Sequence, residues 1–202
     1  MLFESVLFGL AAGLLLGGSL RSLTKASFRC LPLIFVAAVI DFAMSTRLGT
    51  SVAAIGGWAV IAATVLQTIL LIVFVLGNME KPPLWLIGLG GLMNSAAILA
   101  NSGMMPISPQ ILVLAPDSPY TLTLLAGRVA NYTLANPATK LLFLSDIIPF
   151  RGFTFYMISA GDMVTSAGLI ILIISLMQAY SPRYTFFPSK AFDTLDDPPS
   201  SD

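Results

Sequence analysis

The sequence alternates between long apolar stretches and short polar ones. A helix that crosses a bilayer needs about 20 predominantly apolar residues. Several stretches come near this length or exceed it, and each one predicts a membrane-spanning helix. They cover residues 2–20, 30–45, 52–77, 84–100 and 153–180. The pattern therefore predicts an all-α fold, a polytopic transmembrane bundle of about five spans.

The long segment between the last two spans, residues 101–152, contains one further helical pattern. Ser118 followed by Pro119 is typical of a helix start. Four apolar residues after it fall three or four positions apart, as on one face of a helix. They are Leu122, Leu125, Val129 and Tyr132. This pattern predicts a short amphipathic helix on the membrane surface; the alternative is a loop that contains apolar residues.

Composition supports a membrane protein and excludes several kinds of site. The chain is 56% hydrophobic and 10% charged, whereas soluble domains carry about 25% charged residues. A net charge of +0 offers no basic surface for nucleic acid. Without histidine, and with Cys30 as the single cysteine, the chain lacks the residues of zinc, haem and iron–sulfur sites. We therefore expect no metal and no cofactor, and the expected partners are the lipid bilayer and other membrane proteins.

Basic residues predict how the chain is oriented. Arg21, Lys25 and Arg29 follow the first apolar stretch, and short loops rich in lysine and arginine stay in the cytoplasm. Alternation of the spans then predicts a multi-pass protein of the cell membrane with its N-terminus outside. It also places residues 101–152 outside. Residues 181–202, rich in proline and acidic residues, are predicted to be a disordered cytoplasmic tail.

One carboxylate, Asp162, lies inside the fifth apolar stretch. A carboxylate exposed to lipid costs roughly 2.5–3.5 kcal/mol on insertion scales, so Asp162 is expected to face protein or water. Three interpretations stay open. The side chain is a packing contact bonded to an asparagine such as Asn94, it pairs with a cation, or it is a functional acid in a cavity open to the outside. The candidate cations are Arg128, Lys140 and Arg151.

Other polar residues are predicted to gather near Asp162. Asn94 and Asn101 are about two helical turns apart and point the same way. Asp41 lies near the outer end of the second stretch. Together these residues predict an outward-facing pocket for a small polar ligand, a cation or a lipid headgroup. The candidate ligand-binding residues are Asp162, Asn94, Asn101, Asp41, Lys140 and Arg128.

Two motifs in the outer segment allow alternative interpretations. In "NSGMMPIS" the glycine and Pro106 end the fourth helix, so that Asn101 is a helix cap in a turn or also lines the pocket. In "LLFLSDIIPFRG", Asp146 precedes the last span. That motif is a short strand or re-entrant piece that brings Asp146 over the mouth of the pocket, or an ordinary turn with a solvated aspartate.

Three motifs resemble those of an uncharacterised family of small bacterial membrane proteins, a domain of unknown function. They are "NSGMMPIS" at residues 101–108, "LSDIIPF" at 144–150 and "ISAGDMVTSAG" at 158–168. The resemblance implies a bacterial origin and brings no activity with it.

The last two of these motifs are also similar to the aspartate motifs of the lipoprotein signal peptidase family, which are intramembrane aspartyl proteases. Asn136 and Lys140 are similar to that family's Asn-x-x-x-Arg, with lysine in place of arginine. This resemblance implies a hydrolase whose catalytic residues are Asp146 and Asp162. Those peptidases usually have four spans, against about five predicted for this chain.

The sequence thus leaves three functions open and does not decide whether the chain is an enzyme. The first is a binding protein or a subunit of a membrane complex, which needs only a pocket closed at its base. The second is the aspartyl hydrolase, whose two carboxylates must lie within hydrogen-bond or one-water reach. The third is a cation- or proton-coupled transporter using Asp162, whose inward path could draw only on Thr64, Gln67 and Thr68.

Overall fold

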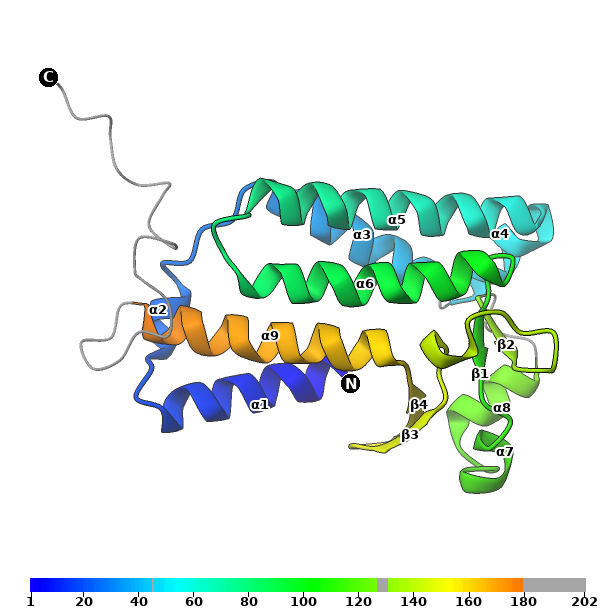
Figure 1. The fold of residues 1–202 in the computed structure, drawn as a ribbon. Helices are drawn as coiled ribbons and strands as arrows, with labels where there is room; N and C mark the ends of the chain where they lie inside the picture. Colours follow the sequence, from blue (N-terminus) through cyan, green and yellow to red (C-terminus); the bar gives the residue numbers. More distant parts are fainter. Residues whose placement is uncertain (45, 127–130, 180–202) are drawn as a thin grey trace, which may run out of the picture.

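The computed structural model describes residues 1–44, 46–126 and 131–179. Long helices lie side by side, and most of the chain between the last two of them forms a cap at one end of the bundle (Figure 1). The bundle contains α1 (Leu2–Leu15), α2 (Leu20–Leu23), α3 (Leu31–Met44), α4 (Arg47–Ile55), α5 (Gly57–Gly77), α6 (Pro83–Ala100) and α9 (Ala160–Gln178). We use "cap" for the described part of residues 103–158.

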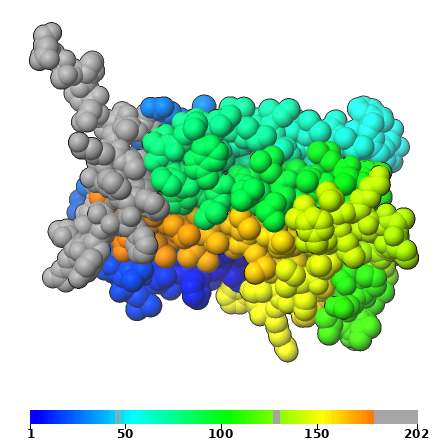
Figure 2. Space-filling view, viewed as in Figure 1, coloured from blue at the N-terminus to red at the C-terminus, as the bar shows by residue number. Residues whose placement is uncertain are grey.

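The cap contains short elements of both kinds. They are β1 (Met105–Ile107), α7 (Ile111–Leu114), α8 (Pro119–Leu125), β2 (Tyr132–Leu134), the 3-10 helix η1 (Leu142–Leu144), β3 (Ile148–Arg151) and β4 (Phe155–Ile158). Strand β1 pairs with β2 in parallel, and β3 pairs with β4 in an antiparallel hairpin. The hairpin, in yellow, projects from the body of the molecule (Figure 2). The predicted all-α class is therefore right in broad terms, but it missed two small sheets.

Three of the described helices are long and apolar enough to cross a membrane, namely α5, α6 and α9. Helices α3 and α4 reach that length only as a pair bent by 83°. Helix α1 is apolar but has only 14 residues. Three to four apolar helices of this length are typical of a membrane protein. The predicted number of about five spans is not reproduced.

The boundaries of three predicted spans differ from the observed helices for local reasons. Residues 52–77 are divided at Gly56, whose φ of +145° is not helical. Residues 2–20 stop being one helix near Gly17, which has a φ of +81°. The fifth helix starts at Ala160, because the preceding β-branched and aromatic residues form the hairpin instead.

Helix α9 is the central helix of the bundle and lies between α6 and α1 (Figure 1). Small residues permit its close approach to α6, as expected for helices in membranes. A Cβ atom on Gly161 would lie 2.7 Å from the backbone oxygen of Gly90, and one on Gly168 would lie 2.8 Å from the Cβ of Leu86. The small residues of the last motif therefore do make a helix interface.

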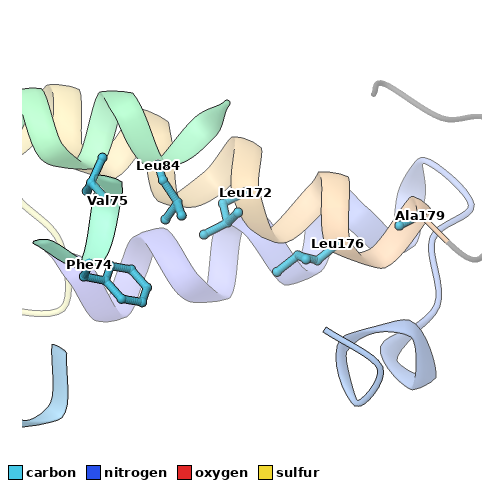
Figure 3. Packing of buried hydrophobic residues seen from close by; sticks show 6 residues of the cluster. All are labelled: Phe74, Val75, Leu84, Leu172, Leu176 and Ala179. Carbon is cyan, nitrogen blue, oxygen red and sulfur yellow. The ribbon is translucent and has the colours of Figure 1, made fainter. Parts of the chain in front are cut away.

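An apolar core fills the end of the bundle that is remote from the cap (Figure 3). The residues of this core are Phe74, Val75, Leu84, Leu172, Leu176 and Ala179. They come from the end of α5, the start of α6, the second half of α9 and Ala179, the residue that follows α9. No polar side chain belongs to this cluster of described residues.

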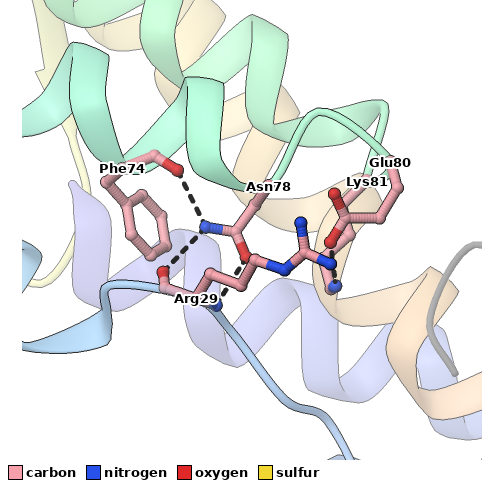
Figure 4. Close-up of polar contacts among 5 residues, drawn as sticks. All are labelled: Arg29, Phe74, Asn78, Glu80 and Lys81. Carbon is pink, nitrogen blue, oxygen red and sulfur yellow. Dashed lines mark hydrogen bonds and ion pairs between the residues drawn. The ribbon is translucent and has the colours of Figure 1, made fainter. Parts of the chain in front are cut away.

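At the same end, the side chain of Asn78 joins two segments of the chain by hydrogen bonds (Figure 4). Its Oδ1 accepts a hydrogen bond from the backbone N–H of Arg29 at 2.8 Å, and its Nδ2 donates to the carbonyls of Arg29 at 2.9 Å and Phe74 at 2.8 Å. Nearby, the fully buried Lys81 lies 2.9 Å from Glu80. One asparagine side chain thus holds the loop before α3 against the end of α5.

The predicted surface helix exists in shortened form. Helix α8 begins after Ser118, whose Oγ accepts a hydrogen bond from the N–H of Thr121 at 3.1 Å, so the predicted start is confirmed. It ends at Leu125, and Tyr132 lies in β2 instead. Thr121 and Leu124 face inward, while Leu122 and Leu125 are exposed. Contact of this helix with a membrane stays a prediction. Val129 and the predicted tail lie outside the described residues.

Candidate functional site

Asp162 lies in the first turn of α9, at the edge of the cap, rather than deep within a helix as predicted. It forms a capping box with Ser159, in which each residue satisfies a backbone N–H of the other. The N–H of Asp162 donates to Ser159 Oγ at 2.8 Å, and the N–H of Ser159 donates to Asp162 Oδ2 at 3.2 Å. The carboxylate therefore helps to define where α9 begins.

Asn94 of α6 completes a small network with these two residues. Its Nδ2 donates to Asp162 Oδ1 at 2.8 Å, and its Oδ1 accepts from Ser159 Oγ at 2.7 Å. We call Asn94, Ser159 and Asp162 the Asn94 network. Both oxygens of Asp162 are hydrogen-bonded within it. Of the three interpretations of Asp162, this geometry is that of a packing contact with Asn94.

The predicted cations are not partners of Asp162 in the described part of the chain. The ion pairs there join Met1 to Glu4 and Lys81 to Glu80. Lys140 is exposed, and so is Arg151 on the hairpin. Arg128 lies outside the described residues.

Asp41 lies on α3 and is not part of the Asn94 network; Gln67 of α5 donates to its Oδ1 over a long 3.4 Å. Next to Gln67, Thr68 shares a hydrogen bond of 2.7 Å with Ser95 of α6. Ser95 in turn follows Asn94 in the sequence. Polar contacts thus join α3 to α5, α5 to α6, and α6 to α9, with Asp41 at one end and the Asn94 network at the other.

Asn101 is a helix cap, as one of its two interpretations predicts, and its role in lining a pocket stays a prediction. It caps the end of α6, and its Nδ2 donates to the carbonyls of Ala97 and Lys140, both at 2.8 Å. Its Oδ1 accepts from the N–H of Lys140 at 2.9 Å. The side chain therefore holds the cap on α6, in the same way that Asn78 holds the loop at the opposite end.

Asp146 is buried in the cap and is not a solvated residue of a turn. Its side chain is 5% exposed. Its backbone extends the small sheet, because its N–H donates to the carbonyl of Pro106 at 2.9 Å and its carbonyl accepts from the N–H of Ser108 at 2.9 Å. The motifs around Asn101 and Asp146, which are 39 residues or more apart in the sequence, thereby meet at β1.

The carboxyl group of Asp146 is electrostatically unusual. Its Oδ1 is buried without a hydrogen-bond partner among the described residues. Burial, and to a lesser degree the charge of Asp162, raises the pKa of Asp146 from 3.8 to about 8. The group therefore keeps its proton at neutral pH. Tyr120 and Tyr132, whose rings meet edge to face at 6.1 Å, also have raised pKa values, chiefly through burial and in part through the charge of Asp146.

A groove of about 520 Å³ lies on the cap beside the backbone of Asp146, within the size range of ligand sites. Its lining residues are Ser108, Pro109, Gln110, Ala135, Asn136, Pro137, Leu142 and Ile147. Two of them flank Asp146, since Ile147 follows it and Ser108 bonds to its backbone. No lining residue is charged. Sequence reasoning missed this groove, although the motif ending at Ser108, Asn136 and the motif around Asp146 all contribute to its lining.

The two aspartates of the hydrolase hypothesis do not share a hydrogen bond in the described structure. Asp162 has both oxygens engaged in the Asn94 network, whereas Asp146 offers an oxygen without a partner. Their use as a catalytic pair stays a prediction. Nor do the described residues contain a group of three or more histidine, cysteine, aspartate or glutamate side chains that could hold a metal ion.

Comparison with known proteins identifies the family. A family of unknown function, DUF5317, has a sequence model that matches residues 25–174. No curated protein and no solved structure matches the chain. The matched region includes α3 to α6, the whole cap and most of α9, and with them all three motifs that resemble an uncharacterised family. The chain therefore belongs to the DUF5317 family.

Proposed function

We propose that this membrane protein binds a small, uncharged ligand with hydrogen-bonding groups in the groove of its cap. The observation that carries the proposal is the buried carboxyl group of Asp146, whose Oδ1 has no described partner and whose chain neighbour Ile147 and backbone partner Ser108 line the groove. Buried polar groups are normally hydrogen-bonded, and each exception calls for an explanation. A bound molecule that reaches this oxygen is one such explanation.

The lining of the groove favours a neutral ligand. Its polar side chains are those of Ser108, Gln110 and Asn136, and its remaining residues are apolar. A cation would be expected to gather several carboxylates, and an anionic headgroup would be expected to gather lysine or arginine. Asp146, protonated at neutral pH, also presents a neutral group rather than a charge.

The remaining predicted functions find less support in this geometry. A transporter needs a route past Asp162, but Leu172 and Leu176 of the same helix belong to the apolar core beyond it. A hydrolase would require a second free carboxylate, and Asp162 is held by Asn94 and Ser159. If the loops rich in lysine and arginine lie in the cytoplasm, the cap faces the exterior, and the ligand reaches the groove from outside the cell.

The test is a binding titration with the purified protein in lipid nanodiscs. The neutral probes are N-acetylglucosamine, glycerol and a blocked dipeptide amide; inorganic phosphate and Mg²⁺ are the charged comparisons. We expect saturable binding of a neutral probe. Gln110→Ala, which loses an exposed amide without a described hydrogen bond, should weaken it about threefold to tenfold, the value of one neutral hydrogen bond.

The matched control is Asp117→Ala, which changes an exposed residue of the cap that does not line the groove. It should leave binding unchanged. The affinity for the neutral probe should also differ between pH 7 and pH 9, because Asp146 has a pKa of about 8 and loses its proton in this range. If only the charged probes bind, or if Gln110→Ala binds as tightly as the unaltered protein, the proposal is wrong.

A further inference from the structure

A carboxylate lies exposed at Asp41, which belongs to α3 of the bundle and does not line the groove. Asp41 belongs to α3, an apolar helix whose neighbouring side chains Val39 and Phe42 are 66% and 72% exposed. Its partner Gln67 is the middle residue of α5, one of the helices long enough to cross a membrane. The carboxylate is therefore at the level of hydrocarbon, where an exposed charge is costly.

The contacts of Asp41 within the chain leave it weakly satisfied. Its described hydrogen bond comes from Gln67 Nε2 at 3.4 Å, near the limit for such a bond. The same nitrogen also donates to the carbonyl oxygen of Ala37 at 3.5 Å. Neither ion pair of the described residues includes Asp41. A carboxylate in this position calls for a donor from outside the chain.

We propose that the flank of α3 around Asp41 binds a transmembrane helix of another membrane protein, and that this helix carries a lysine or an arginine opposite Asp41. Charge complementarity selects such a partner, because charged groups within membranes pair with one another. Ala38, one turn before Asp41 and exposed, is small enough to let a helix approach closely.

A second copy of this chain is a poorer occupant of the flank. None of the ten lysine and arginine residues of the sequence lies within α1, α3, α5, α6 or α9, and the one nearest to Asp41 in the sequence, Arg47, begins α4. The helices of a second copy that are long enough to cross a membrane would therefore bring no cation, and a symmetric pair would bring two Asp41 carboxylates together. The inference stands independently of the groove, which lies on the cap.

The experiment is photo-crosslinking in membranes of the native host. The full chain carries p-benzoylphenylalanine in place of Phe42, next to Asp41; the matched control has it in place of Phe8, which is 67% exposed on α1. We expect an adduct from position 42 that is absent from position 8. Mass spectrometry should identify a membrane protein cross-linked through a helix that contains lysine or arginine.

Charge dependence completes the test. Asp41→Asn keeps the size of the side chain and its contact with Gln67 but removes the charge, and should lower the yield of the adduct roughly fivefold or more. Asp41→Glu should restore it. Unchanged circular dichroism and unchanged elution of both variants exclude misfolding as the cause.

Any other outcome would overturn the proposal. These outcomes are an adduct of two copies of this chain, an adduct with lipid only, no adduct, or an adduct with a helix that lacks a basic residue. The proposal is also overturned if Asp41→Asn leaves the yield of the cross-linked adduct unchanged. Loss of ligand binding at the groove would not bear on it, so the two proposals fail separately.

Discussion

The most direct test of the bundle is Asn94→Ala, which removes the side chain that joins α6 to α9 beside the cap. The change deletes two hydrogen bonds, one to Asp162 at 2.8 Å and one from Ser159 at 2.7 Å. Hydrogen bonds between membrane helices contribute about 0.6 kcal/mol on average and up to about 1.7 kcal/mol. The bond to a carboxylate belongs to the stronger kind. We therefore expect Asn94→Ala to lower the free energy of unfolding by about 2 kcal/mol.

The assay is reversible unfolding by titration with sodium dodecyl sulfate in mixed micelles, followed by far-ultraviolet circular dichroism. Ser166→Ala is the matched control, because Ser166 lies on α9 and its Oγ is buried without a partner among the described residues. Removing that hydroxyl should cost nothing measurable, or should stabilise the protein slightly. The reasoning is refuted if Asn94→Ala costs less than about 0.5 kcal/mol, or no more than Ser166→Ala.

Three further predictions concern the cap and the helix interface. Because the pKa of Asp146 is raised on folding from 3.8 to about 8, stability should fall as the pH rises from 5 to 8 in thermal unfolding, and Asp146→Asn should flatten that slope; an equal slope in both proteins would contradict it. Gly161→Ala should lower the free energy of unfolding by about 1–3 kcal/mol, because the added methyl group would meet α6. Gly57→Ala should not lower it, because no atom lies within 4 Å of the position of its added methyl group; equal effects would disprove close packing. Asn101→Ala should speed hydrogen exchange at the amide of Lys140, measured by mass spectrometry, and unaltered exchange would show that Asn101 does not hold the cap.

The membrane character and the longest helices could be predicted because apolar length and composition report directly on burial in lipid. Helices α3, α5 and α6 lie close to their predicted positions. The start of α9 was misplaced because "FTFYMI" is as apolar as a span but also favours extended structure. Only the pairing of this segment with Ile148–Arg151, which the sequence pattern does not reveal, decides between the two.

The candidate site was predictable in part. The bond between Asn94 and Asp162 follows from the cost of an unpaired carboxylate near lipid, and it is present. The contact of Asp41 with Gln67 could not be foreseen, because it depends on which face of α3 turns toward α5. The burial of Asp146 depends on a sheet built from distant segments, so a polar residue in a turn-like motif gave no indication of it.

The paired polar residues on α5 and α6 restrict rotation of these helices about their own axes. Consecutive residues on a helix point about 100° apart. Thr68 therefore holds α6 while Gln67 makes long contacts with α3, and Asn94 and Ser95 hold α9 and α5 at the same time. Turning either helix to improve one contact would pull the other apart. Rocking of one half of the bundle against the other, as alternating access requires, would break such contacts together. The bundle is thus constructed as a rigid platform on which the cap keeps a constant orientation.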